Sequence, residues 1–185
     1  MSVLILGGRP GSGKSAAVKR ILQGYSGELE NIKPTKLVNA VYVPSQKLHV
    51  LGKYDEGETF PGTDRLSMAV QPKAVEWIGA NRDEKILLEG DRLFNSKFVS
   101  TLLEAGIDVH VWILECSEEA LQNRYKQRGS NQSEKFLKGR ATKVNNMIEF
   151  CSETLGDAEF KVVTNEREED SERLSEDIRK FFKLV

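Results

Sequence analysis

The sequence predicts an α/β fold in which a five-stranded, mostly parallel sheet lies between layers of helices. Short β-branched runs alternate with longer segments of helical periodicity along the 185 residues, as expected for successive β-α-β units. A glycine-rich segment directly follows the first apolar run, at a point where such folds turn from a strand into a helix. The sequence contains no repeat or interdomain linker, so we expect one domain that spans residues 1–185.

Each expected element follows from the local pattern of apolar residues. Short apolar runs predict the strands of the sheet, at 3–6, 37–43, 85–88, 108–114 and 160–163. A further run, 47–51, is compatible with a short edge strand or one arm of a hairpin. Apolar residues at helical spacing predict helices at 15–25, 64–80, 94–105, 117–128, 133–154 and 168–182. Pro72 should kink or split the second helix, and Gly106 should end the third.

Composition and charge exclude several classes of protein. The chain has 27 Lys and Arg residues against 28 Asp and Glu residues, a formal net charge of −1, which excludes a uniformly basic nucleic-acid binder. Its two cysteines, Cys116 and Cys151, have no metal-binding or disulfide spacing, as expected in a reducing compartment. No apolar run approaches the roughly 20 residues that span a bilayer, and the run at 3–6 is too short for a signal peptide. We therefore expect a cytoplasmic protein without a membrane partner.

The glycine-rich segment, residues 8–15, reads GRPGSGKS and matches the phosphate-binding pattern G-x-x-x-x-G-K-[ST]. Its glycines let backbone N–H groups surround phosphate oxygens, and the N-terminus of the following helix adds a partial positive charge. We expect Lys14 to contact the β- and γ-phosphates of ATP and Ser15 to bind Mg²⁺. The alternative is a glycine-rich turn with an incidental Lys-Ser pair. The expected nucleotide-binding residues are Gly8, Gly11, Ser12, Gly13, Lys14, Ser15 and Ala16.

Acidic residues follow the strand expected at 85–88, where the carboxyl ends of parallel strands line the ligand crevice. Glu89 and Asp91 flank Gly90, and either carboxylate is a candidate to hold Mg²⁺ through a bound water. Asp91 is also a candidate contact for the phosphate acceptor. The alternative for both acids is a structural role, as the cap of the next helix or in a solvated turn.

A second acidic position, Asp64, lies at the start of the helix expected at 64–80. A kinase needs a carboxylate that accepts the proton of the attacking hydroxyl, and we expect Asp64 to be this base. Arg65 follows directly and is suited to pair with a phosphate of the acceptor. Because Thr and Asp are also good helix caps, a structural role for Thr63 and Asp64 is the alternative.

Residues 122–143 carry seven basic residues and one acid. We expect them to form a helical lid that neutralises the transferred phosphate, with Arg124 and Arg128 on one helix face as catalytic arginines. The alternatives are a solvated charged face and a stripe that follows a nucleic-acid backbone. Residues 166–177 carry seven acids against two arginines and balance this charge. Asn165, after the last expected strand, is a candidate to hold the adenine base, or else a turn residue.

Three segments together carry a resemblance to a known family: the loop at 8–15, FPGTDRLS at 60–67 and LLEGDR at 87–92. In this combination the chain resembles the bacteriophage P-loop kinases that phosphorylate 5-hydroxymethyluracil in DNA, and more loosely the kinase domain of polynucleotide kinases. The resemblance implies a P-loop kinase fold with a helical lid and ATP-dependent phosphorylation of the hydroxymethyl group. It also implies DNA with modified thymine bases as the substrate, and the cytoplasm of an infected bacterium as the location.

Carried over residue by residue, the resemblance implies that Lys14 and Ser15 bind nucleotide and metal, that Asp64 activates the acceptor and that the two arginines named above belong to the lid. An enzyme that modifies a base within DNA reaches it by flipping the base out of the stack. Tyr54 and Phe60 are candidates to stack on such a base.

Two other functions fit the same motifs. A kinase of free nucleosides or nucleoside monophosphates would share all of them, and a nucleotide-dependent switch would share the phosphate-binding loop. A GTPase would carry an N-K-x-D guanine motif, which this sequence lacks, and a motor ATPase would be longer. The motifs therefore favour a small phosphotransferase, and they indicate no oligomeric state.

Overall fold

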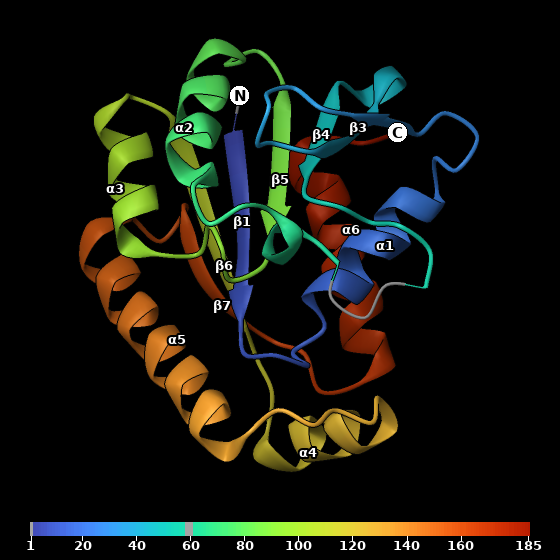
Figure 1. Ribbon diagram of the computed structural model, residues 1–185, viewed down its shortest axis with the longest axis vertical. Coiled ribbons are helices and arrows are strands. Elements are labelled where there is room, and N and C mark those ends of the chain that lie inside the picture. Colours follow the sequence, from blue (N-terminus) through green and yellow to red (C-terminus); the bar gives the residue numbers. More distant parts are fainter. Residues whose placement is uncertain (1, 58–60) are drawn as a thin grey trace.

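The computed structural model describes residues 2–57 and 61–185, and within them the strands form one mostly parallel sheet. The strands are β1 (Ser2–Gly8), β2 (Glu30–Ile32), β3 (Ala40–Val43), β4 (Leu48–Leu51), β5 (Lys85–Glu89), β6 (Asp108–Glu115) and β7 (Phe160–Thr164). Their order in the sheet is β2-β3-β4-β5-β1-β6-β7 (Figure 1). In this part of the chain, β3 pairs antiparallel with both of its neighbours and every other pair is parallel.

Helices cover both faces of the sheet, which confirms the predicted α/β class. They are α1 (Lys14–Gln23), α2 (Val70–Ala80), α3 (Ser96–Glu104), α4 (Glu118–Gln127), α5 (Glu134–Thr154) and α6 (Glu168–Phe182). The helices α2, α3 and α5 pack on one face, α1 and α6 pack on the other, and α4 lies beyond the carboxyl ends of the central strands (Figure 1). None of the described helices combines the length and the apolar character needed to cross a lipid bilayer.

The central strand β1 is buried on both faces, which makes it a rigid support for the loop that follows it. Val3 and Ile5 belong to the hydrophobic cluster under α2, α3 and α5, while Leu4 and Leu6 belong to the cluster under α1 and α6. This alternation follows from the two-residue period of a strand, and it explains why the whole run is apolar. The strands β1, β5, β6 and β7 are parallel, and their carboxyl ends point toward the side of the molecule where α4 lies (Figure 1).

The number of strands differs from the prediction, because the described residues contain seven strands where the sequence predicted five. The run at 47–51 was predicted as an edge strand or hairpin arm, and as β4 it lies inside the sheet between β3 and β5. The strand β2 has the sequence Glu-Asn-Ile, which shows no apolar alternation. It exists because its backbone pairs with β3, a long-range interaction that local pattern does not reveal.

The helix predicted at 64–80 is shorter than expected and begins at Val70. Thr63–Arg65 instead form a 3₁₀ turn, whose side chains contact the end of β5. Pro72 was predicted to kink or split the helix, and this prediction is wrong. It lies in the first turn of α2, where the missing N–H breaks no intrahelical hydrogen bond.

The contact between Gly7 and Phe94 provides a test of this packing. A Cβ atom at Gly7 would overlap the buried Phe94 ring, with ring atom Cδ2 at only 2.8 Å. We therefore expect Gly7→Ala to lower the free energy of unfolding by about 1–3 kcal/mol, as overpacked cores do. Urea denaturation should show that adding Phe94→Leu restores part of this loss, because leucine lacks the outer ring atoms. A double variant no more stable than Gly7→Ala would contradict the proposed clash.

Candidate active site

The glycine-rich loop leaves the end of β1 and enters α1 in a conformation that its glycines permit. Gly8, Gly11 and Gly13 have φ angles of 143°, 80° and 97°, a region that residues with a side chain rarely adopt. Gly13 is the N-cap of α1, so the N-terminus of this helix begins directly at the loop. Strand, loop and helix are thus arranged as a phosphate-binding loop requires.

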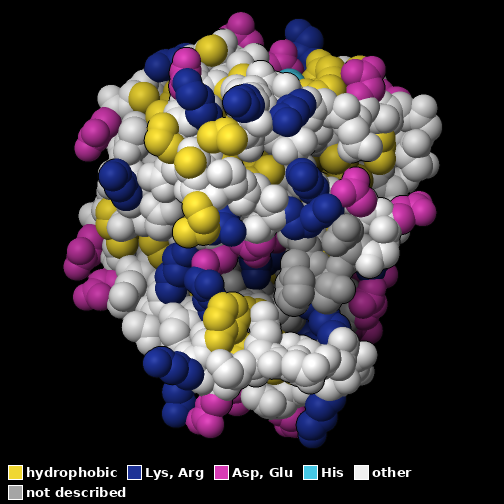
Figure 2. Space-filling view, in the orientation of Figure 1, with side chains coloured by type: hydrophobic (Ala, Val, Ile, Leu, Met, Phe, Trp, Pro, Cys, Tyr) yellow, Lys and Arg dark blue, Asp and Glu magenta, His cyan; other side chains and the backbone are white. Residues whose placement is uncertain are grey.

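A cavity of about 800 Å³ opens beside this loop at the carboxyl edge of the sheet. Figure 2 shows the hollow, with Lys, Arg and acidic side chains gathered around it. Four parts of the chain line it: the loop after β1, the turn at 61–65, the end of β5 and the junction of α4 with α5. The lining includes these predicted site residues: Gly8, Gly11, Lys14, Ser15, Asp64, Arg65, Glu89, Asp91 and Arg128.

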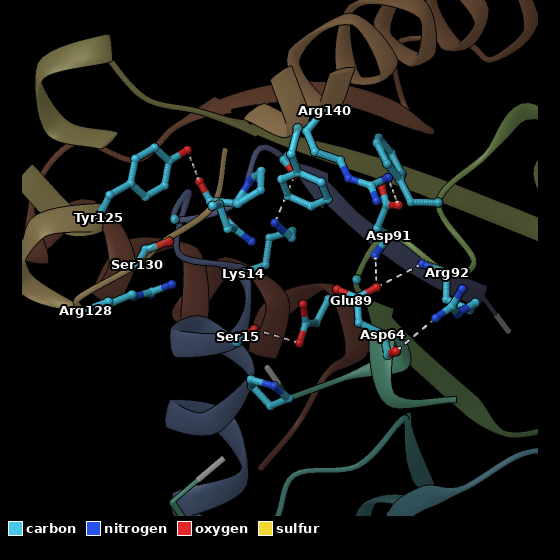
Figure 3. Close-up of a pocket in the computed structure, with 18 of the residues that line it drawn as sticks. Lys14, Ser15, Asp64, Glu89, Asp91, Arg92, Tyr125, Arg128, Ser130 and Arg140 are labelled. Atoms are coloured by element: carbon cyan, nitrogen blue, oxygen red, sulfur yellow. Dashed lines mark hydrogen bonds and ion pairs between the residues drawn. The ribbon is translucent and has the colours of Figure 1, made fainter. Parts of the chain in front are cut away.

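Lys14 lies at the centre of the site (Figure 3). Its Nζ donates hydrogen bonds to the carbonyl oxygens of Gly8 and Arg9, at 2.9 and 3.0 Å. Burial lowers the pKa of Lys14, and the carboxylates of Glu89, Asp64 and Asp91 oppose this effect. The loop therefore holds a cation close to where phosphates would bind, within reach of three negative charges.

Ser15 and Glu89 form the oxygen-rich part of the site. Ser15 Oγ donates a hydrogen bond of 2.9 Å to Glu89 Oε1, and the Tyr54 hydroxyl donates to the same oxygen at 3.2 Å. Glu89 is only 1% exposed, and this burial raises its pKa to about 7, against the opposing effects of Lys14 and Ser15. Because burial disfavours the charged form of Glu89, a cation bound nearby would stabilise that charged form.

The oxygen donors at this position fit Mg²⁺. The described residues contain no cluster of three or more potential metal-binding side chains. Mg²⁺ does not need one, because it commonly takes one or two protein oxygens and fills its other positions with phosphates and water. Of the two acids considered as metal ligands, the structure places Glu89 beside Ser15.

Asp91 makes a different set of interactions. Its carboxylate forms ion pairs with Arg140 and with Lys143 Nζ, the latter at 2.9 Å, and its carbonyl oxygen accepts a second bond from Lys143. Figure 3 shows Arg140 reaching the end of β5 from α5. Asp91 thus connects the end of β5 to helix α5, the second helix of the predicted lid.

Asp64 is fixed by backbone groups at the end of β5. Its Oδ1 accepts hydrogen bonds from the N–H groups of Asp91 and Arg92, at 2.6 and 3.0 Å. Within the described residues its Oδ2 has no hydrogen-bond partner, and Asp64 lines the cavity and is exposed. The alternative that Asp64 caps a helix starting at residue 64 is wrong, since α2 starts at Val70.

The close approach of these two segments depends on Gly90. Its φ angle is 111°, and a Cβ atom there would lie 2.7 Å from Thr63 Oγ1 and 3.2 Å from Asp64 Oδ1. Thr63 is fully buried, and its hydroxyl donates to the carbonyl oxygen of Glu89 at 2.9 Å. The candidate base and the candidate metal ligand are therefore held by the same turn. Arg65, next to Asp64, forms an ion pair of 2.7 Å with Asp55.

The two lid arginines occupy different places. Arg128, at the end of α4, is exposed and lines the cavity on the side of Lys14 away from Asp64 (Figure 3). Arg124 instead packs on the phosphate-binding loop, donating to the carbonyl oxygens of Gly11 and Asn165, each at 2.9 Å. Arg124 thus fixes α4 to the loop.

Asn165 lies under the phosphate-binding loop rather than on an open surface. It is 1% exposed, and its Nδ2 donates to the carbonyl oxygen of Ser12 at 2.6 Å. A Cβ atom at Gly13 would overlap this amide. Its buried position therefore suits support of the loop better than contact with an adenine base. Ala16 is exposed on the first turn of α1.

The aromatic residues that line the cavity differ from those that the sequence singled out. Tyr54 was predicted to stack on a base; it is partly buried, its hydroxyl donates to Glu89, burial raises its pKa well above the usual value, and it is not among the described residues that line the cavity. Phe60 lies outside the described residues. Tyr125 on α4, Phe136 on α5 and Phe94 between β5 and α3 line the cavity and were not predicted, because only tertiary packing brings these segments together.

The fold and the site define a P-loop phosphotransferase. The family model described as P-loop Nucleotide Kinase3 matches residues 1–179, so the chain belongs to this family. A sugar kinase from Janibacter sp. HTCC2649 is 16% identical with a TM-score of 0.51, over 100% of this chain and 95% of that chain, and shares the fold. A gluconokinase from Sinorhizobium meliloti 1021 is 17% identical with a TM-score of 0.46, over 100% and 98% of the two chains. The comparison with curated proteins finds no match.

The position of Glu89 predicts how activity depends on Mg²⁺. Glu89→Gln should raise the Mg²⁺ concentration for half-maximal activity by roughly 10-fold or more, because it removes the charged oxygen beside Ser15. Titration of the initial rate with MgCl₂ measures this. The matched control is Asp91→Asn, which should leave the Mg²⁺ requirement unchanged. The reverse pattern would show that Asp91 serves the metal.

The substitution Asp64→Asn distinguishes a catalytic role of Asp64 from a purely structural one. Asparagine keeps an Oδ1 that accepts the two backbone hydrogen bonds, so the turn should fold normally, but it no longer accepts a proton. We expect kcat to fall about 100-fold or more, with ATP affinity nearly unchanged. Steady-state kinetics together with thermal denaturation test this. A loss of stability with intact kcat would assign Asp64 a structural role only.

Proposed function

We propose that this protein transfers the γ-phosphate of ATP to an alcohol, and that its acceptor is the hydroxymethyl group of 5-hydroxymethyluracil in DNA. The observation that carries the proposal is the position of Asp64. Its carboxylate is oriented by two backbone N–H groups and lines the same cavity as Lys14 and the Ser15–Glu89 pair. This position suits a group that accepts the proton of the attacking hydroxyl, which transfer to an alcohol requires.

In the proposed reaction each group has a defined role. The loop N–H groups and Lys14 bind the β- and γ-phosphates, and Ser15 and Glu89 are the residues that would hold Mg²⁺, which when bound neutralises phosphate charge. Asp64 accepts the proton of the acceptor hydroxyl. The acceptor oxygen forms a bond to the γ-phosphorus as the bond to the bridging oxygen breaks, and ADP leaves. Arg128 stabilises the charge on the transferred group.

Positive charge around the cavity supports a polyanionic acceptor. Basic residues outnumber acids in its lining, although Arg65 pairs with Asp55 and Arg140 with Asp91. The basic residues are Lys14, Arg65, Arg92, Arg128 and Arg140, and the acids are Asp64, Glu89 and Asp91. The chain as a whole has a net charge of −1, so this charge is local. A local basic surface is sufficient to contact the phosphates on either side of a flipped base. The resemblance of residues 60–67 and 87–92 to DNA base kinases supports the same acceptor.

A nucleoside or nucleoside monophosphate kinase is the second candidate. One observation favours it: a single cavity of about 800 Å³ is lined by the phosphate-binding loop, by Asp64 and by residues 129–132. ATP and a small acceptor could therefore share this cavity. Cavities of this size commonly bind small molecules. The family description, a nucleotide kinase, is compatible with either acceptor.

Phosphate transfer from γ-labelled ATP distinguishes the acceptors. Duplex DNA that contains 5-hydroxymethyluracil should become labelled, and matched DNA with thymine should not, since thymine lacks the hydroxyl. Free 5-hydroxymethyldeoxyuridine and its monophosphate should be labelled at least about 10-fold more slowly, because they lack the flanking phosphates that the arginines contact. Labelling of the free compounds alone would establish the second candidate. ADP release that no acceptor stimulates would indicate a nucleotide-dependent switch.

A further inference from the structure

Phe136 is an aromatic residue whose exposure the fold does not explain. It lies in the first turn of α5, lines the cavity and is 37% exposed. Among the described residues, the other large apolar side chains with this much exposure lie outside the cavity: Leu29, Met68, Val162 and Val185. Figure 2 shows apolar surface at the rim of the hollow. Neither hydrophobic core cluster includes Phe136.

The position of the Phe136 ring is fixed relative to Asp64. The Ser133 side chain caps α5 and accepts a hydrogen bond of 3.2 Å from the Phe136 N–H. One turn further along α5, the Arg140 guanidinium lies 4.6 Å from the centre of the ring. Arg140 pairs with Asp91, whose N–H holds Asp64 Oδ1. Three successive contacts thus connect the aromatic ring to the candidate base.

The other described aromatic residues of the cavity are already engaged. Phe94 is 2% exposed, and Tyr125 is 7% exposed with its hydroxyl bound to the carbonyl oxygen of Pro10 at 2.7 Å. Phe136 is the aromatic residue in this set that keeps free surface on the cavity side. Asn131 and Gln132, which precede α5, line the same cavity and carry amide side chains. An amide presents a donor and an acceptor together, which matches the edge of a uracil ring.

We propose that Phe136 is the surface on which the pyrimidine ring of the acceptor stacks, with Asn131 and Gln132 beside the edge of the ring. This inference rests on the proposed function, because it assumes an acceptor hydroxyl carried by a base. The Arg140 guanidinium lies over one face of the Phe136 ring, and the exposed part of the ring offers an aromatic surface on which a planar base can stack. Stacking on Phe136 would keep the base in the cavity while its hydroxymethyl group reaches Asp64.

Substitutions at Phe136 test the stacking. Phe136→Ala and Phe136→Leu should raise the KM for the acceptor by roughly 10- to 100-fold, because they remove the aromatic surface. Phe136→Leu retains apolar packing, so a change in this variant reports the loss of the ring rather than misfolding. Phe136→Tyr should keep the KM within about threefold of the wild type, since the ring remains. The KM for ATP should stay within about twofold in all three variants.

A control variant and a direct binding measurement distinguish a failure of the stacking proposal from a failure of the proposed function. Leu29→Ala removes a side chain that is also 37% exposed but lies outside the cavity, and it should leave the acceptor KM unchanged. Fluorescence anisotropy with labelled 5-hydroxymethyluracil DNA, without ATP, should show the same order of affinities. Unchanged acceptor KM in the Ala and Leu variants of an active enzyme, or an equal rise in the KM for ATP, would overturn the stacking and leave the proposed function standing. A wild-type enzyme that labels no base-containing acceptor would overturn both.

Discussion

The hydrogen bonds that Asp64 accepts from the backbone of Asp91 and Arg92 are the interaction on which the acceptor side of the site depends. They attach the turn Thr63–Arg65 to the end of β5, a strand in the middle of the sheet. Asp91 in turn binds Arg140 and Lys143 of α5. One short backbone segment therefore sets the relative positions of Asp64, the central sheet and helix α5.

The nucleotide side is held by a separate group of contacts. Arg124 and Asn165 bind carbonyl oxygens of the phosphate-binding loop, at Gly11 and Ser12. These bonds hold two carbonyl oxygens of the loop and so help to fix its backbone conformation before a ligand binds. Such preorganisation matters because phosphoryl transfer is catalysed mainly by positioning and by charge stabilisation.

The sequence predicted features that depend on neighbouring residues and missed those that depend on distant ones. The loop at 8–15 follows from its own glycines, and the central strands follow from continuous apolar runs. The start of α2 was misplaced because the apolar spacing before Val70 is helical, whereas Thr63 and Asp64 bind the end of β5 instead. The choice between Glu89 and Asp91, and the exposure of Phe136, depend on contacts across the fold that a linear pattern does not contain.

The acceptor-side residues are carried by segments outside the two hydrophobic clusters. Asp64, Asn131 and Phe136 belong to a turn, a connection and a helix end, and none of them contributes to either cluster. Exposed positions such as Asn131 and Phe136 generally tolerate substitution with little change in folding stability, whereas Asp64 also holds its turn to the end of β5. The phosphate-binding loop, by contrast, is fixed by the strand and helix that it joins. Substitutions at the two exposed positions can therefore reshape one side of the cavity while the phosphate-binding loop keeps its conformation.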